Sequence, residues 1–223
     1  MKRDEFAHTL EQALLRPDVD RRSVEEACAA AVRDHLGALV VLPCYVRIAA
    51  PLLAGSGVKP VSVVGFPLGA TLSEVKAREA RLLFDQGAEE LDMVLHLPWF
   101  FSGEYDAVRE DIAGVVQEAR GHVVKVILET SLLDEGGIVK ACQLARDAGA
   151  SFVKTSTGFG AGGATEEAVA LMRRTLGNRM GIKASGGIRT LDQALSLLEA
   201  GADRLGTSGA MDLLAQWDQR FRG

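Results

Sequence analysis

The chain has 223 residues and a mass of 23.8 kDa, a length that predicts a single domain. Hydrophobic residues make up 48% of it and aromatic residues only 5%, so we expect a core of Ala, Val and Leu, as in many α/β proteins. The formal net charge is −5 and no basic tract stands out, which excludes nucleic acid as the main partner.

Other sequence patterns argue against a membrane protein and a metalloprotein. The longest apolar stretch, residues 38–54, is interrupted by Pro43, Arg47 and Pro51, so no membrane span is predicted. The first ten residues lack the apolar core of a secretory signal. The three cysteines are scattered without a CxxC motif, which is typical of reduced thiols in a cytoplasmic protein. The four histidines lack metal-ligand spacing, so we expect no metal site.

The first element has a helical pattern. Within residues 5–15, Phe6, Leu10, Ala13 and Leu14 lie on one face of a 3.6-residue period. This segment is therefore predicted to be a helix.

A recurring Gly-Ala dipeptide organises the rest of the chain. Each copy closes an Ala-rich amphipathic segment and precedes a strand-like run. Glycine supplies the left-handed conformation that ends a helix, and alanine permits a tight passage into the strand. The four copies are Gly37-Ala38, Gly87-Ala88, Gly149-Ala150 and Gly201-Ala202.

Seven strands alternate with helices along the chain. The strands are predicted at 39–42, 61–65, 91–94, 123–128, 152–154, 181–184 and 204–206, and helices at 72–86, 107–120, 137–148, 166–176 and 191–200. Near-continuous apolar strands between amphipathic helices predict a parallel sheet covered by helices. The regular repetition favours a (β/α)₈ TIM barrel forming a single domain over residues 1–223, with an open doubly wound sheet as the alternative. The residues alone supply seven of the eight strands.

Polar residues interrupt the apolar strands near their C-terminal ends, where active sites of such barrels lie. Asp92 lies within a strand, and a buried aspartate needs a partner, for which a lysine across the barrel is the simplest choice. Asp92 is then either a counter-charge or a group that moves protons. Glu129 is expected to bond to a loop. Lys125, which is followed by three apolar residues, is interpreted as a structural residue that faces the other way.

Two lysines occur in the same sequence context, which favours a nucleophilic amine. Lys154 and Lys183 each end an apolar strand and are followed by a loop rich in Gly, Ser and Thr. Burial favours the neutral, nucleophilic amine, and two neighbouring cations lower each other's pKa, as in Schiff-base lysines. A single lysine at a strand end is more often a solvated rim charge, but the repeated arrangement favours the nucleophilic interpretation.

Two Gly-rich loops predict a phosphate site. Residues 185–190 precede the helix that begins near Leu191, and residues 206–209 follow the last strand. Free N–H groups at a helix N-terminus bind phosphate, and in TIM barrels this site lies after strands 7 and 8. Each loop taken alone is equally consistent with an ordinary turn.

Together these motifs resemble deoxyribose-phosphate aldolase, a family of class I aldolases with a (β/α)₈ fold. The resemblance extends over nearly the whole chain from residue 55 onward. It rests on VGFPLGA (64–70), GAEELDMV (87–94), KVILET (125–130), FVKTSTGF (152–159), KASGGIRT (183–190) and GADRLGTS (201–208).

The resemblance implies a role for each matched residue. Lys154 would form the Schiff base, Lys183 would lower its pKa, and Asp92 would transfer protons. The residues implied for the substrate phosphate are Gly158, Gly186, Gly187, Gly206 and Ser208. The family cleaves 2-deoxy-D-ribose 5-phosphate to glyceraldehyde 3-phosphate and acetaldehyde without a metal or other cofactor. The resemblance also implies a short first strand at about 10–15 and a homodimer.

The chain departs from the family pattern at four places near the expected barrel mouth. The usual Asp-x-Thr of the first strand is Glu11-Gln12-Ala13, and the second strand reads Val40-Val41-Leu42-Pro43 without its usual polar residues. The usual Asn-Ile-Gly is His96-Leu97-Pro98, and the usual Thr-Ser-Ser is Thr207-Ser208-Gly209. Two alternatives therefore stand beside the family's reaction: a related lysine aldolase with a different acceptor aldehyde, and a catalytically silent barrel that binds sugar phosphates.

Overall fold

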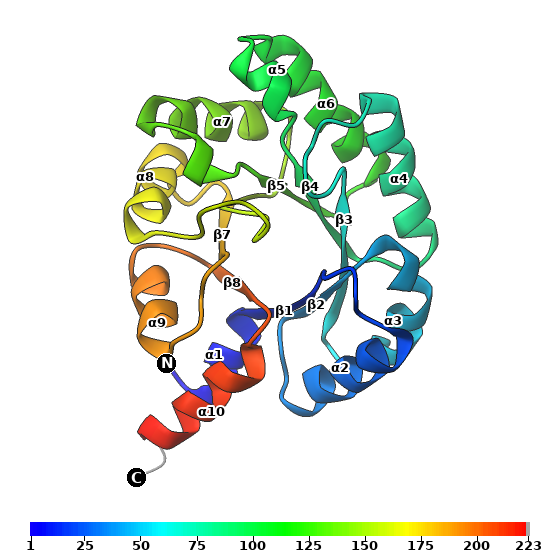
Figure 1. Ribbon diagram of the computed structural model, residues 1–223, viewed down its shortest axis with the longest axis vertical. Coiled ribbons are helices and arrows are strands. Elements are labelled where there is room, and N and C mark those ends of the chain that lie inside the picture. Colours follow the sequence, from blue (N-terminus) through cyan, green and yellow to red (C-terminus); the bar gives the residue numbers. More distant parts are fainter. Residues whose placement is uncertain (222–223) are drawn as a thin grey trace.

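Eight parallel strands close into a barrel in the computed structural model, which describes residues 1–221 (Figure 1). The strands follow one another around the barrel in chain order, and β8 pairs with β1 to close it. Their bounds are β1 Leu10–Leu14, β2 Ala38–Val41, β3 Lys59–Val64, β4 Glu90–Val94, β5 Val123–Ile127, β6 Phe152–Lys154, β7 Gly181–Ser185 and β8 Arg204–Thr207. The predicted (β/α)₈ barrel is therefore confirmed, and its closure excludes the open doubly wound sheet.

Helices surround the strands on the outside of the barrel (Figure 1). Their bounds are α1 Arg3–Thr9, α2 Arg21–Arg33, α3 Val46–Leu53, α4 Ser73–Asp85, α5 Leu97–Phe101, α6 Tyr105–Glu118, α7 Glu135–Asp147, α8 Glu166–Leu176, α9 Leu191–Glu199 and α10 Ala210–Phe221. Short 3₁₀ helices follow β2 at Pro43–Tyr45 and β5 at Thr130–Leu132. The first and last helices lie side by side, because Phe6 on α1 stacks on Trp217 of α10 with ring centroids 4.7 Å apart.

The helix predicted over residues 5–15 is correct up to Thr9 and wrong from Leu10 onward. The helix α1 ends at Thr9, and β1 begins at Leu10, which agrees with the first strand implied by the family resemblance. In β1, Glu11 is in register with Ala38 of β2 and with Gly206 of β8. Pairing on both sides removes the two sheet edges that β2 and β8 would otherwise expose. Barrel closure, a non-local effect, therefore overrides the local helical periodicity.

Three of the four Gly-Ala pairs end helices as predicted. Gly87, Gly149 and Gly201 have φ angles of +103°, +85° and +114°, in the left-handed region that favours glycine. Gly37 differs, because an added Cβ would lie 2.2 Å from the carbonyl oxygen of His8. At this position glycine is required by close backbone approach rather than by a helix cap.

The barrel interior has an apolar side. Most of the core lies between the strands and the helices, but a separate cluster fills the interior next to β2 and β3. Its buried strand residues are Ala38, Val40, Val61 and Val63. Charged side chains occupy the rest of the interior, as described below, so the barrel offers one apolar and one charged wall.

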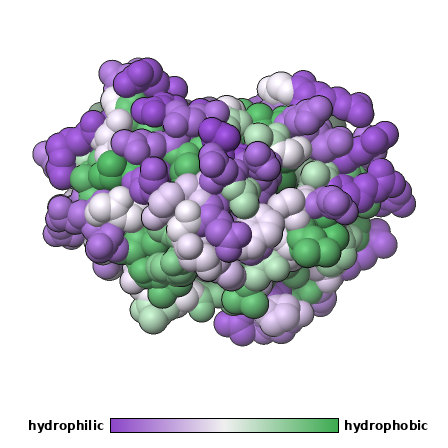
Figure 2. Space-filling view, turned by 90° about the horizontal axis from the view of Figure 1, so that it is seen from above, coloured by the Kyte–Doolittle hydropathy of each residue, from purple (hydrophilic) through white to green (hydrophobic). Residues whose placement is uncertain are grey.

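The outer surface is a mixture of polar and apolar side chains. Figure 2 shows this for the side of the molecule on which α5 lies in Figure 1. Within residues 1–221, none of the helices combines the length and the apolar character needed to cross a membrane.

Candidate active site

A cavity of about 620 Å³ opens at the C-terminal ends of β6, β7, β8 and β1. Lys154 and Lys183 line it, and so do all the residues that the family resemblance implies for phosphate, namely Gly158, Gly186, Gly187, Gly206 and Ser208. The structure therefore brings two separately predicted groups together at the end of the barrel where TIM-barrel enzymes have their active sites.

The two predicted lysines meet at one carboxylate oxygen. Lys154 on β6 is in register with Lys183 on β7, so their side chains share the interior face. Asp92 Oδ2 on β4 accepts a hydrogen bond from Lys154 Nζ at 2.8 Å and another from Lys183 Nζ at 2.7 Å. All three side chains are buried. Asp92 therefore has the lysine partners that its position within a strand demands.

The electrostatics of this triad favour a reactive amine. Burial is the largest influence on Lys154, and together with the nearby ammonium of Lys183 it lowers the pKa of Lys154 to about 8, against the opposing attraction of Asp92. For Asp92, burial alone would raise the pKa, but Lys125, Lys154 and Lys183 outweigh it and hold the pKa of this carboxyl well below its ordinary value. Near pH 8 about half of Lys154 is therefore the neutral amine, beside a carboxylate that stays ionised.

Lys125 faces the barrel interior, which corrects its predicted orientation. It is in register with Asp92, and register partners on neighbouring strands share a face. Its Nζ donates to Asp92 Oδ1 at 3.1 Å and lies 2.6 Å from Glu90 Oε2. Burial alone would lower the pKa of Lys125, but Asp92, Glu11 and Glu90 raise it above its ordinary value. Lys125 therefore remains a cation within the same charge cluster.

The sequence analysis did not predict the acidic role of β1 in this cluster. Glu11 is fully buried, its Oε2 pairs with Lys183 Nζ, and its Oε1 accepts from Arg204 Nη1 at 3.0 Å. Burial alone would raise the pKa of Glu11, but Lys125 and Lys183 hold it at about 2. The signal in the sequence is that Glu11 stands where the resembled family has the aspartate of its Asp-x-Thr motif, but the helical periodicity of the segment concealed its place in a strand.

Comparison with known proteins shows similarity to aldolases over almost the whole chain. Residues 3–219 match the model of the DeoC/LacD family aldolases. The chain belongs to this family. It is 47% identical over 218 residues to the deoxyribose-phosphate aldolase of Thermococcus kodakarensis, with 96% of this chain and 97% of the relative covered. The corresponding enzyme of Mannheimia succiniciproducens is 44% identical over 214 residues, with 96% of each chain covered.

Solved structures show the same similarity. An aldolase called QR15 superposes with a TM-score of 0.92 at 39% identity, covering 96% of each chain. A deoxyribose-phosphate aldolase from Aeropyrum pernix, described as having a unique tetrameric structure, superposes with a TM-score of 0.92 at 36% identity, covering 98% of this chain and 93% of the other.

Several N–H groups at the N-terminal end of α9 already have partners within the chain. The N–H groups of Arg189 and Thr190 donate to Gln193 Oε1 at 3.0 and 3.2 Å, and that of Leu191 donates to Gln216 Oε1 at 2.8 Å. The N–H of Leu191, the first residue of α9, and those of the two residues before it are thus already paired. The glycines before the helix remain the candidates, since Gly186 and Gly187 adopt φ angles of +91° and +77° at the cavity wall.

Gln12 on β1 fixes the loop after β8. Its Nε2 donates to the carbonyl oxygen of Ser208 at 2.8 Å, and its Oε1 accepts from the N–H of Ala210 at 2.9 Å. The N–H of Ala210, the first residue of α10, is therefore also paired within the chain. Gln12 thus links β1 to Ser208 at the cavity wall.

Glu129 holds the loop that follows Lys154, as its strand-end position predicts. Its Oε2 accepts from Thr157 Oγ1 at 2.5 Å and from the N–H of Thr157 at 3.2 Å. Glu129 itself adopts a φ of 54°, a left-handed conformation that is uncommon outside glycine. Thr157 lines the cavity beside Lys154 and Gly158. The carboxylate thus anchors one wall of the site.

Only some of the departures from the family pattern face the cavity. Ala13 and Val40 line it, and they extend the apolar wall of the barrel interior to the mouth. His96 does not line this cavity. Its ring stacks on that of Trp99 at 3.7 Å between centroids, and its Nδ1 accepts from the N–H of Trp99 at 3.4 Å as the cap of α5. The structure thus places Ala13 and Val40 at the cavity, but not His96.

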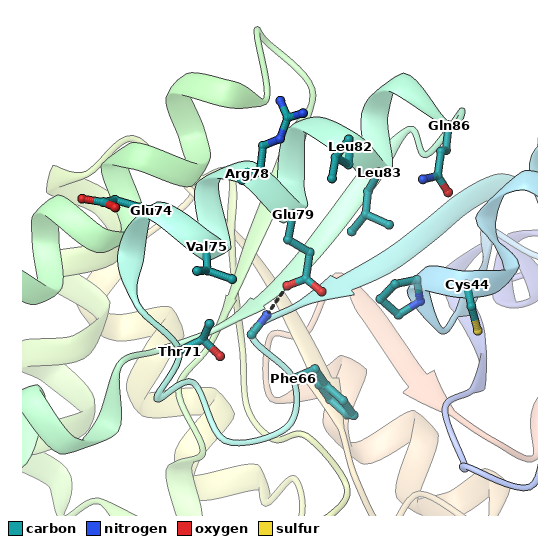
Figure 3. A pocket seen from close by; sticks show the side chains of 12 residues that line it. Cys44, Phe66, Thr71, Glu74, Val75, Arg78, Glu79, Leu82, Leu83 and Gln86 are labelled. Atoms are coloured by element: carbon teal, nitrogen blue, oxygen red, sulfur yellow. Dashed lines mark hydrogen bonds between the residues drawn. The ribbon is translucent and has the colours of Figure 1, made fainter.

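A second cavity, of about 710 Å³, lies beside α4 outside the barrel (Figure 3). Val75 and Leu82 line it, and Glu79 reaches across it to accept a hydrogen bond from the N–H of Gly65 at 2.9 Å. It contains none of the predicted catalytic residues. Within residues 1–221, no group of three or more His, Cys, Asp and Glu side chains is arranged to hold a metal ion.

Gly206 makes room for Lys183, which leads to a prediction. An added Cβ at Gly206 would lie 2.8 Å from Lys183 Cε and 2.9 Å from Ser185 Cβ. We expect Gly206→Ala to displace the flexible lysine and to lower kcat/KM about tenfold to a hundredfold, the equivalent of one charge-assisted hydrogen bond. Steady-state kinetics check this. Gly114→Ala in α6, where the nearest atom would be 3.9 Å away, is the matched control and is expected to keep wild-type activity.

Proposed function

We propose that this protein reversibly cleaves 2-deoxy-D-ribose 5-phosphate to D-glyceraldehyde 3-phosphate and acetaldehyde through a Schiff base on Lys154. The observation that carries the proposal is the buried amine of Lys154, whose pKa is lowered to about 8, at the cavity that Lys183 and the glycine loops also line. Membership of the DeoC/LacD aldolase family supports it, as do relatives named deoxyribose-phosphate aldolase.

The proposed reaction begins at the amine. Neutral Lys154 Nζ attacks the C1 aldehyde, and loss of water gives an iminium cation. The iminium accepts the electron pair of the C2–C3 bond as the C3 hydroxyl loses its proton, which releases glyceraldehyde 3-phosphate. The enamine that remains is protonated at C2, and water then hydrolyses the resulting iminium to acetaldehyde and free Lys154.

Asp92 and Lys183 are the groups that we assign to the proton transfers. Both lie within hydrogen-bond distance of one another, and Asp92 also contacts Lys154 Nζ at 2.8 Å. An ionised carboxylate beside two amines can pass protons between the substrate hydroxyl, the carbinolamine oxygen and C2, directly or through a water. Asp92 also favours the iminium cation electrostatically, because the positive charge forms next to its carboxylate.

We place the substrate phosphate at the glycine loops of the cavity. Gly158, Gly186 and Gly187 adopt positive φ angles there, and without side chains their N–H groups can approach a phosphate closely. Gly206 and Ser208 lie on the same wall. If two charge-assisted hydrogen bonds are lost, 2-deoxyribose without its phosphate is expected to react with a kcat/KM lower by at least about a hundredfold. Equal rates for the two sugars would contradict this placement.

A coupled assay tests the proposed function itself. Release of glyceraldehyde 3-phosphate from 2-deoxyribose 5-phosphate is expected with purified protein in the presence of a chelator, and the Lys154→Ala variant is expected to be inactive. Binding of the sugar phosphate without product release would instead support the catalytically silent barrel.

The apolar wall favours one second candidate, an aldolase of the same mechanism with a different acceptor. Ala13 and Val40 place only methyl groups at the cavity where a hydroxyl or thiol would recognise a polar acceptor. With acetaldehyde as donor, a screen of acceptor aldehydes discriminates between the two candidates. A kcat/KM for an acceptor without hydroxyls that exceeds the value for glyceraldehyde 3-phosphate would favour the second.

We further propose that the protein acts as a homodimer. The support is the family resemblance alone, and the Aeropyrum pernix relative is described as a tetramer. Light scattering coupled to size exclusion measures the assembly directly, and a monomer or tetramer mass would replace the dimer.

A further inference from the structure

The charge cluster continues from Lys154 to the opposite end of the barrel. Asp92 joins Lys125, whose Nζ lies 2.6 Å from Glu90 Oε2, and the same oxygen accepts from Arg204 Nη1 at 2.6 Å. Glu90 and Arg204 are the first residues of β4 and β8, whereas the cavity lies at the other ends of the strands. Neither residue lines the cavity. The active site is thus connected to a distant ion pair by direct contacts.

The composition of this cluster leaves one cation in excess. Its four cationic groups are Lys125, Lys154, Lys183 and Arg204, and its three carboxylates are Glu11, Glu90 and Asp92. An uncompensated charge is costly in a buried cluster, whereas balanced pairs are tolerated. The loss of one proton from one lysine makes the cluster neutral.

Lys154 is the lysine that has the least compensation. Lys125 lies within 4 Å of three carboxylates, at 2.6, 3.1 and 3.7 Å. Lys183 contacts two, Glu11 and Asp92, but Lys154 contacts only Asp92. The proton that the cluster gives up most easily is therefore the one on the proposed nucleophile.

We propose that Glu90 and Arg204, at the end of the barrel away from the substrate, set the fraction of Lys154 that is the neutral amine. This inference rests on the proposed function for its catalytic consequence, but not for its test. Glu90 and Arg204 act through the lysines and contact no substrate, so they are charge-setting rather than catalytic residues.

Other charged groups near the amine are unchanged by variants of these two residues. Arg16 and Arg189 line the cavity, and Arg16 is paired with Asp18 at 2.8 Å. Glu129 is bonded to Thr157 on the loop after β6. Any shift in the titration of Lys154 between the variants therefore reports on the distant ion pair.

Two substitutions are expected to move the titration of Lys154 in opposite directions. Arg204→Met removes a cation, so the cluster is balanced with Lys154 protonated, and the midpoint is expected to move up by about half to one pH unit. Glu90→Gln removes a carboxylate, leaves two cations in excess, and is expected to move the midpoint down by a similar amount. A merely structural role would not produce shifts of opposite sign.

The readout does not require aldolase activity. Reductive methylation by formaldehyde and cyanoborohydride, quantified on the Lys154 peptide by mass spectrometry across pH 5–11, measures the neutral amine directly. Substrate trapping is measured in parallel, so loss of trapping with an intact labelling curve would overturn the proposed function alone. Shifts of the same sign in both variants, or no shift in either, would overturn the inference about the cluster.

Two further variants are the controls. Arg204→Lys keeps the charge and is expected to keep the wild-type midpoint. Arg173→Met removes a half-buried arginine that pairs with Asp203 outside the barrel interior, and it is expected to leave the Lys154 midpoint unchanged. If Glu90→Gln does not fold, the two Arg204 variants still decide. An upward shift of the Lys154 midpoint in Arg204→Met but not in Arg204→Lys supports the inference, and no shift in Arg204→Met overturns it.

Discussion

Replacing Lys154 by methionine is expected to lower kcat/KM for 2-deoxyribose 5-phosphate cleavage by at least about a thousandfold, since the reaction loses the covalent nucleophile that we propose. Methionine keeps most of the volume of the buried side chain. It also removes the cation with the fewest carboxylate partners, so the charge cluster becomes balanced. The thermal unfolding midpoint is therefore expected to stay at or above that of the wild type, which separates a chemical loss from misfolding.

Lys76 offers a matched control for this substitution. It is also a fully buried lysine paired with an aspartate, Asp111, at 2.7 Å, but it lies outside the barrel between α4 and α6. Lys76→Met is expected to cost stability, because it leaves the buried Asp111 carboxylate without its cation, and to retain kcat. A Lys154→Met enzyme with kcat/KM within tenfold of the wild type would contradict the assignment of the nucleophile.

Loss of the Asp92 carboxylate is expected to have the largest effect on stability. Asp92 is the shared acceptor of Lys125, Lys154 and Lys183, so Asp92→Ala leaves three buried ammonium groups without it. Breaking a buried ion pair costs about 3–5 kcal/mol, and we expect at least this decrease in the free energy of unfolding at pH 7. Activity is expected to fall as well, because the group proposed to transfer protons is gone.

The direction of the pKa shift of Asp92 determines how its contribution to the free energy of unfolding depends on pH. The pKa of Asp92 is depressed in the folded protein, so its contribution to stability is complete above the ordinary aspartate value of 3.8. It is lost only as the pH falls through the depressed folded value. The Asp92 carboxylate is ionised at both pH 5 and pH 7. Urea denaturation is therefore expected to give the same difference in the free energy of unfolding between wild type and Asp92→Ala at these two pH values.

A surface aspartate provides the control for Asp92. Asp85 on α4 pairs with Arg81 at 4.0 Å, and both side chains are exposed. Asp85→Ala is expected to change the free energy of unfolding by less than about 1 kcal/mol. A loss of this small size for Asp92→Ala would mean that the three lysines do not depend on that carboxylate.

The sequence predicted most of the barrel because its strands are apolar runs bounded by helix-ending glycines. It missed β1, since Phe6, Leu10, Ala13 and Leu14 satisfy a helical period and the pairing that makes 10–14 a strand is non-local. The family resemblance supplied what local periodicity did not.

The site was predictable where a residue breaks a local pattern. Lys154, Lys183 and Asp92 interrupt apolar strands, and the structure joins them at one oxygen. Glu90 and Arg204 lie at strand starts, where a charge is ordinary, and they meet only because the sheet closes into a barrel that brings β4 and β8 across from one another.

The hydrogen bonds at the N-terminus of α9 could also have been predicted from the sequence. Thr190-Leu191-Asp192-Gln193 fits the capping-box pattern, in which a threonine and a glutamine three residues later satisfy the first N–H groups of a helix. That pattern favours phosphate binding by the preceding glycines rather than by the helix itself.

Borohydride reduction in the presence of 2-deoxyribose 5-phosphate, followed by peptide mass spectrometry, is the most direct test of the central claim. The proposal predicts a reduced sugar-phosphate or ethyl adduct on the peptide that contains Lys154, at that residue, and none in Lys154→Met. An adduct on Lys183 in the wild-type protein, or no adduct despite binding of the sugar phosphate, would contradict it.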